Sequence, residues 1–203
     1  MRKARRPAPA VLLCAALFLA VAAPSLAQRG AITLPRNLAQ LTNQSAVIVR
    51  GQIIGTRVEP LASYPSLWTV VVTLRVQDVL KGAPGQILTF RQFIWDARDR
   101  YDGAGYLRGQ DIVMLLNPVT QLGLTSPAGL SQGVFHIGRN AKGELVAANG
   151  FGNAGLFRGV AGSASARPAT VSPRLAGILA APPTGPLKLD DLEALIRNFA
   201  EQD

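Results

Sequence analysis

The strongest constraint on the fold is an alternating segment within residues 67–85. Apolar side chains occupy every second position, and the residues between them are mainly threonine, arginine and glutamine; the apolar set is Trp68, Val70, Val72, Leu74 and Val76. A period of two gives a β-strand one apolar face, whereas a helix would scatter the same residues around its axis. The run ends at Lys81-Gly82-Ala83-Pro84-Gly85, which is typical of a turn. The segment therefore predicts a strand with one buried face, to which the rest of the chain adds further strands.

Residues 1–27 have the three-part pattern of a secretory signal peptide. A basic start precedes an apolar segment at 11–23, and Ser25 and Ala27 are the small residues expected before cleavage. The apolar segment is shorter than the ~18–20 residues of a membrane-spanning helix. We therefore expect cleavage after Ala27, a secreted or periplasmic protein, and no transmembrane segment in the mature chain. A lipoprotein is disfavoured because Leu13 precedes Cys14, at a position where a small residue would be expected.

Removal of this leader changes the composition of the chain. Four of the 21 basic residues lie in it, so the remaining 17 against 12 acidic residues give the mature chain a net charge of +5. The single cysteine, Cys14, also lies in it. A disulfide, a thiol nucleophile and a cysteine metal site are therefore excluded from the mature chain. The modest positive charge favours weak attraction to anionic surfaces over dedicated nucleic-acid binding.

Further strands are predicted on both sides of the alternating segment, at 46–54, 86–93, 112–116, 133–137 and 144–147. The strand at 86–93 follows the turn closely and is expected to form an antiparallel hairpin with the alternating segment. Gly51 interrupts the first strand at a point where a bulge or bend is expected. The run at 112–116 is apolar throughout, which predicts a strand buried on both faces.

The C-terminal part divides into a linker and a helix. Residues 158–186 are rich in Ala, Pro, Ser and Gly without a sustained period, which is linker composition. Within residues 187–203 the apolar side chains recur at helical spacing, namely Leu192, Leu195, Ile196 and Phe199. Asp190 and Glu193 have the spacing of a capping box. We expect an amphipathic helix that covers an open part of the β-domain at 28–157.

Several short segments together carry a resemblance to a known family. They are residues 46–51, 72–76, 79–82, Gly109-Gln110-Asp111 and Met114-Leu115-Leu116, continued by Gly133 and Phe135. Over about residues 41–148 the chain resembles exported bacterial proteins whose domain is similar to the netrin and tissue-inhibitor-of-metalloproteinase modules. The resemblance implies a mainly β fold, an OB-like antiparallel barrel of five or more strands with the C-terminal amphipathic helix.

The inhibitory chemistry of the metalloproteinase inhibitors is not expected in this chain, despite the resemblance. The metalloproteinase inhibitors of this group present an N-terminal cysteine to the zinc of their target. Here the predicted mature terminus is Gln28, and no cysteine follows it. A shared fold does not by itself transfer a function.

Three motifs match functional patterns only in part. Residues 129–133 read Gly-Leu-Ser-Gln-Gly, but strand-like residues follow where a nucleophile elbow needs a helix, and His136 is expected on the solvated face of that strand. Residues 150–155 match a dinucleotide pattern that is followed by coil composition. Asp96, Asp99 and Asp102 lie three apart with arginines between them, unlike a calcium loop, so a solvated loop is favoured over a weak cation site.

The sequence favours a non-enzymatic binding or interaction module of the cell envelope. With one histidine and no cysteine in the mature chain, the usual groups of acid–base and nucleophilic catalysis are lacking. No cofactor and no metal are expected. An inhibitor that occludes a secreted hydrolase and an unrecognised enzyme remain alternatives. The expected partner is an envelope or extracellular protein or an anionic polymer.

The candidate binding residues are Arg75 and Arg91. If residues 81–85 close a tight hairpin, Arg75 lies directly opposite Arg91 on its outward face. The two guanidinium groups, flanked by Thr73, Gln77 and Thr89, would then form a basic strip for carboxylates or other anions.

Overall fold

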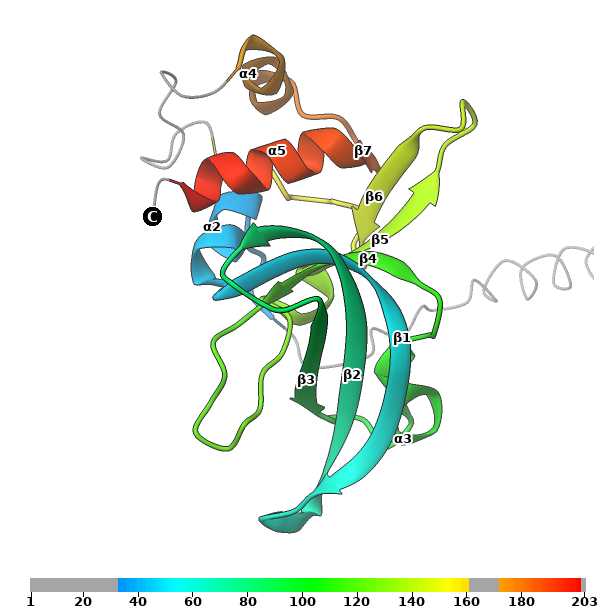
Figure 1. The fold of residues 1–203 in the computed structure, drawn as a ribbon. Helices are drawn as coiled ribbons and strands as arrows, with labels where there is room; N and C mark the ends of the chain where they lie inside the picture. The colour runs from blue at the N-terminus through cyan, green and yellow to red at the C-terminus, as the bar shows by residue number, and fades with distance from the viewer. Residues whose placement is uncertain (1–32, 161–171, 202–203) are drawn as a thin grey trace, which may run out of the picture.

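The computed structural model describes residues 33–160 and 172–201, so the predicted signal peptide lies outside the described residues. The chain forms a seven-stranded antiparallel sheet in the order β3-β2-β1-β4-β5-β6-β7 (Figure 1). The strands are β1 (Val47–Leu61), β2 (Tyr64–Lys81), β3 (Ile87–Phe93), β4 (Asp111–Leu116), β5 (Val134–Arg139), β6 (Leu145–Asn149) and β7 (Leu187–Lys188). The sheet is open, with β3 and β7 as its two edges. The predicted mainly β, antiparallel domain is confirmed, as a sheet that does not close into a barrel.

Helices flank the sheet, and some of them connect consecutive strands. They are α2 (Leu38–Gln44), α3 (Asp99–Asp102), α4 (Pro173–Ala180) and α5 (Leu189–Ala200), with short 3-10 turns η1 (Gly103–Gly105) and η2 (Leu130–Gln132). α2 and α5 pack against each other (Figure 1). Within residues 33–160 and 172–201, every helix is too short or too polar to cross a membrane.

β1 and β2 form a long curved hairpin that extends beyond the other strands (Figure 1). β1 was predicted to end at residue 54, but it continues to Leu61 and turns at residues 62–63 into β2. The ladder shifts register between Arg50 and Gly51, as expected for a bulge. A Cβ atom at Gly51 would lie 2.6 Å from the carbonyl oxygen of Arg75 on β2. Only glycine lets the two backbones approach this closely.

The sheet separates two apolar cores. One core, between the curled strands, contains Val49, Ile53, Val70, Val72, Leu74, Phe90, Ile112 and Met114. The other, between the sheet and the helices, contains Leu38, Leu41, Ile48, Val113, Leu115, Phe135, Leu192 and Phe199. β4 contributes alternate side chains to each, and its residues 112–116 are all buried. The prediction of a strand buried on both faces is confirmed.

The predicted inward face of β2 is also confirmed. Val70, Val72 and Leu74 are buried together with Phe90, and Trp68 and Leu88 pack against the same core. The opposite face is less solvated than the alternation suggests, because Thr69 and Val71 are buried there as well. Polar side chains from β1 and β3 lie beside them on that face, as described below.

The segment predicted as a linker contains α4 at Pro173–Ala180. Its N-cap is Ser172, whose side chain accepts a hydrogen bond from the Leu175 N–H, and Pro173 occupies the first helical turn. Composition did not reveal this helix, because short helices with few large apolar residues resemble coil in sequence.

The predicted C-terminal amphipathic helix is confirmed as α5, but its predicted capping box is wrong. The helix begins at Leu189 after Lys188, which makes no side-chain capping bond. Glu193 instead accepts a hydrogen bond from Arg50 of β1 at 3.1 Å. Arg197 donates to Asp78 of β2 at 2.5 Å. These ion pairs tie the helix to the hairpin, and its apolar side chains complete the second core.

Leu74 and Thr73 test the assignment of faces. Leu74→Ala should lower the free energy of unfolding by about 2–5 kcal/mol because it empties part of a packed core. Thr73→Ala should cost less than about 1 kcal/mol because it loses only a hydroxyl contact on the more exposed face. Chemical denaturation of both variants measures the difference, and equal losses would contradict the assignment.

Glu193 should make stability depend on pH. Burial raises the pKa of its carboxyl, against the opposing effect of Arg50. The folded chain therefore holds this proton more tightly than the unfolded chain, and the contribution of Glu193 to stability falls as pH rises above its ordinary pKa.

The pH dependence of the natural chain is compared with that of the Glu193→Gln variant, whose side chain at this position cannot titrate. The unfolding free energy of the natural chain minus that of the variant should decrease between about pH 4 and about pH 7. Denaturation curves across this range measure the difference, and a constant or rising value would contradict the assigned burial effect.

Candidate functional site

Arg75 and Arg91 lie on the same outer face of the sheet but do not oppose each other. Arg75 pairs with Ile87, and Arg91 pairs with Val71. The predicted direct opposition is therefore wrong. The end of β2 continues past β3 and pairs with β1, so the last hairpin bond joins the Val76 N–H to the Gln86 carbonyl. At ~3.3 Å per residue, the four positions from residue 71 to 75 separate the two arginines by about 13 Å along the sheet.

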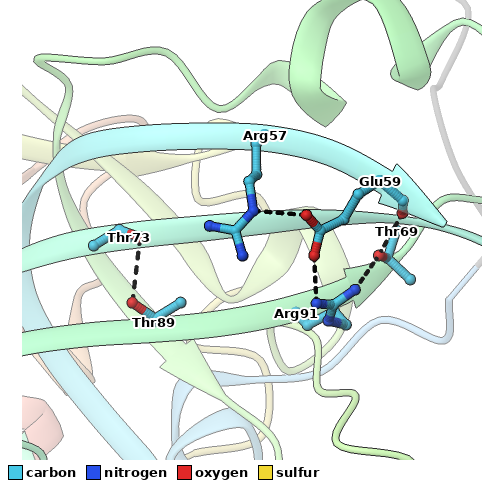
Figure 2. A network of polar contacts seen from close by, with 6 residues as sticks. All are labelled: Arg57, Glu59, Thr69, Thr73, Thr89 and Arg91. Atoms are coloured by element: carbon cyan, nitrogen blue, oxygen red, sulfur yellow. Dashed lines mark hydrogen bonds and ion pairs between the residues drawn. The ribbon is translucent and has the colours of Figure 1, made fainter. Parts of the chain in front are cut away.

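The neighbour of Arg91 is Arg57 of β1. Register places Arg57, Val71 and Arg91 in one row across β1, β2 and β3. The carboxylate of Glu59 accepts a hydrogen bond from Arg57 Nε at 2.7 Å and one from Arg91 Nη2 at 2.5 Å. Figure 2 shows both guanidinium groups directed toward this one carboxylate. We name the three residues the Arg57–Glu59–Arg91 triad.

Thr69 holds Arg91 from a second side. Arg91 Nη1 donates to Thr69 Oγ1 at 3.1 Å, and the Thr69 hydroxyl donates to the Glu59 carbonyl at 2.8 Å. Thr73 and Thr89 share a hydrogen bond of 3.2 Å in the next row of the same face (Figure 2). The Arg91 side chain is 26% exposed and the Arg57 side chain 62%. Arg91 is thus fixed in place, while Arg57 lies at the solvent.

The triad carries a net charge of +1 at neutral pH. The hydrogen bond from Arg57, with further contributions from Arg91, lowers the pKa of the Glu59 carboxyl, so this group stays ionised between two guanidinium cations. Arg75, farther along the same face, is exposed, and its side chain makes no hydrogen bond or ion pair with any described residue. The face is therefore basic, and it presents hydroxyl and guanidinium donors together.

A groove of about 300 Å³ borders this face at the edge of the sheet. Segment 117–125 forms one wall, because the Thr125 N–H donates to the Arg91 carbonyl at 2.8 Å. The lining combines apolar and polar side chains, namely Val47, Arg57, Val71, Leu88, Thr89, Phe90, Arg91, Leu116, Val119 and Thr125. Such a site suits a ligand with both carboxylate and apolar groups.

Arg57 and Glu59 were missed from sequence because the first strand was predicted to stop before them. One signal for them was present. An arginine and a glutamate two positions apart lie on the same side of a strand, so a longer β1 would have placed them together.

His136 lies in a separate cavity of about 230 Å³, which Trp95, Asp99, Tyr106 and Ser131 also line. It belongs to β5 and is exposed, as expected. Burial of part of the ring lowers its pKa. Within the described part of the chain, neither the Ser131 hydroxyl nor the His136 ring forms a hydrogen bond. The hydrogen bond that would activate a serine nucleophile is therefore absent between Ser131 and His136.

The aspartates considered for a cation are held by local contacts. Arg98 donates to both carboxylate oxygens of Asp96, at 3.1 and 3.0 Å from Nε. Asp99 and Asp102 begin and end the single turn of α3. In the ranges 33–160 and 172–201, no three histidine, cysteine or acidic residues gather into a group that could hold a metal ion.

Glu59→Gln should strengthen retention on an anionic matrix, because it removes the carboxylate that neutralises one of two guanidinium groups. The matched control is Glu144→Gln, which removes an equal charge from an ion pair with Lys188 at 2.6 Å, remote from the triad. We expect Glu59→Gln to elute from a sulfonate column at higher salt than the control. Equal elution would show that the triad does not contact the matrix.

Comparison with known proteins assigns no role to this site. No protein-family model, no curated protein and no solved structure matches the chain. The arrangement of the triad and the groove is therefore the basis for assigning a function.

Proposed function

We propose that the chain is an exported, non-enzymatic binding module of the cell envelope, and that it binds an anionic partner on the outer face of β1, β2 and β3. The triad is the observation that carries this proposal. It holds Arg91 between Glu59 and Thr69, and it leaves a net positive charge beside a groove.

The fixed position of Arg91 supports a binding role. A free arginine loses side-chain entropy when it binds a ligand, whereas an arginine already held by two partners loses less. The planar guanidinium pairs with carboxylate or phosphate through two parallel hydrogen bonds. Arg57 remains exposed and can rotate toward an incoming anion.

The outer face offers additional contacts along its length. Thr73 and Thr89 lie in the row next to Arg91, and Arg75 follows one row farther on. A partner with several carboxylates could therefore contact Arg91, the two hydroxyls and Arg75 in succession. An anionic polymer, one of the partner classes expected from the sequence, fits this description, and so does an acidic segment of a protein.

We also propose that the fold is an incompletely closed OB-like barrel, similar to that of the netrin modules. Two observations support it. β1 is long, bent at Gly51, and shared between β2 and β4. The segment after β4 returns to the free edge of β3 through the bond between Thr125 and Arg91. The signal-peptide pattern at residues 1–27 supports export.

The double variant Arg57→Ser, Arg91→Ser tests the proposed surface. Its matched control is Arg108→Ser, Arg139→Ser, which removes the same charge from exposed residues elsewhere on the molecule. On a polyglutamate matrix, the triad variant should elute at clearly lower salt than the control. Retention of the natural chain should also weaken with salt, since the Debye length falls from ~10 Å at 0.1 M to ~3 Å at 1 M.

Circular dichroism establishes that both variants are folded. If the two folded variants elute at the same salt, binding follows net charge alone and the triad is not the binding surface.

A further inference from the structure

The outer edge of β3 has a defined set of backbone groups that point away from β2. In an antiparallel pair, alternate residues direct both N–H and C=O toward the neighbouring strand. The Gln86 carbonyl accepts a bond from Val76 of β2, whereas the Arg91 carbonyl accepts one from Thr125 on the opposite side. The odd-numbered residues of β3 therefore direct their backbone groups outward.

Ile87 and Thr89 form the unoccupied part of this edge. Their outward N–H and C=O groups form no hydrogen bond with any residue that the structure describes. Both residues are exposed, Ile87 to 53%. At Arg91 the edge is covered by Thr125. A short stretch of unpaired strand is a ready template for another extended chain.

The groove beside this edge has two chemically different sides. Leu88 and Phe90 face the inner core, and Val47 and Leu116 lie near them in the groove lining. Thr89 and Arg91 lie on the outer face with Arg57. Side chains of a strand alternate between its two faces. An added strand would therefore place every second side chain against apolar residues and the others against arginine and threonine.

We infer that the partner contributes an extended acidic segment that adds to the sheet as a strand along Ile87 and Thr89. The inference rests on the proposed anion-binding function and specifies the form of its partner. Charge complementarity selects the occupant, since the triad and Arg75 are both positive. A second copy of this chain would bring a second basic β3 to the same edge. The segment should alternate apolar and acidic residues, because main-chain bonds give affinity and alternate pockets give specificity.

A fluorescein-labelled peptide of about eight residues, alternating valine and glutamate, serves as the probe, with a length typical of a strand. The control peptide has the same composition, with all valines before all glutamates. The chain variants are Thr89→Pro and Ile87→Pro, which remove one outward N–H each. Proline is tolerated at an edge where the N–H is unpaired and at the first residue of a strand. Thr89→Val removes the hydroxyl and keeps the N–H, so it separates the loss of a side-chain contact from the loss of the backbone donor.

Fluorescence anisotropy should show the alternating peptide bound at least about tenfold more tightly than the block peptide. Each proline variant that is folded by circular dichroism should lose about tenfold in affinity relative to the natural chain, and Thr89→Pro should bind more weakly than Thr89→Val. Equal affinity of the two peptides, or of the proline variants and the natural chain, would overturn strand addition.

Failure of strand addition is distinguishable from failure of anion binding. If the peptide does not depend on Thr89 but the polyglutamate matrix still depends on Arg57 and Arg91, the anionic surface stands and strand addition falls. A dimer in sedimentation velocity that Thr89→Pro abolishes would instead assign this edge to a second copy of the chain, and would overturn the acidic partner.

Discussion

The antiparallel pairing of β1 with β2 is the interaction on which the rest of the structure depends. β1 also pairs with β4, and β4 connects β1 to the remaining strands of the sheet. Strand pairing over this length forces curvature, and the bulge at Gly51 absorbs it by letting the β1 backbone approach the Arg75 carbonyl. The two apolar cores then form on opposite faces of this one bent layer.

The candidate site depends on a second irregularity in the same ladder. A register shift between Ile53 and Gly55 sets Arg57 opposite Val71 and Glu59 opposite Thr69. Without it, the outer and inner residues of the distal half of β1 would exchange faces. The carboxylate of Glu59 would then leave Arg91 on the outer face and enter an apolar core. The ion pairs of the site and the packing of the core are thus set by one local feature of the backbone.

Sequence alone predicted the elements that periodicity reveals. The faces of β2, the doubly buried β4 and helix α5 all follow from the spacing of apolar side chains, and each is present. Register was not predictable, because the turn sequence after Lys81 does not show that the end of β2 pairs with β1 instead of β3. Of the site, Arg91 was identified, but its partners Arg57 and Glu59 were not. These two partners lie beyond Gly55, and a glycine at that point favours the end of a strand.

The position of α5 has a consequence for when the chain can fold. Leu192, Leu195, Ile196 and Phe199 are fully buried in the core that also contains Leu38 and Leu41 of α2. Residues near the two ends of the described chain must therefore meet before that core is closed. A chain that is synthesised from its N-terminus keeps this apolar surface uncovered until the last turn of α5 has emerged. Such late closure is compatible with the export proposed above.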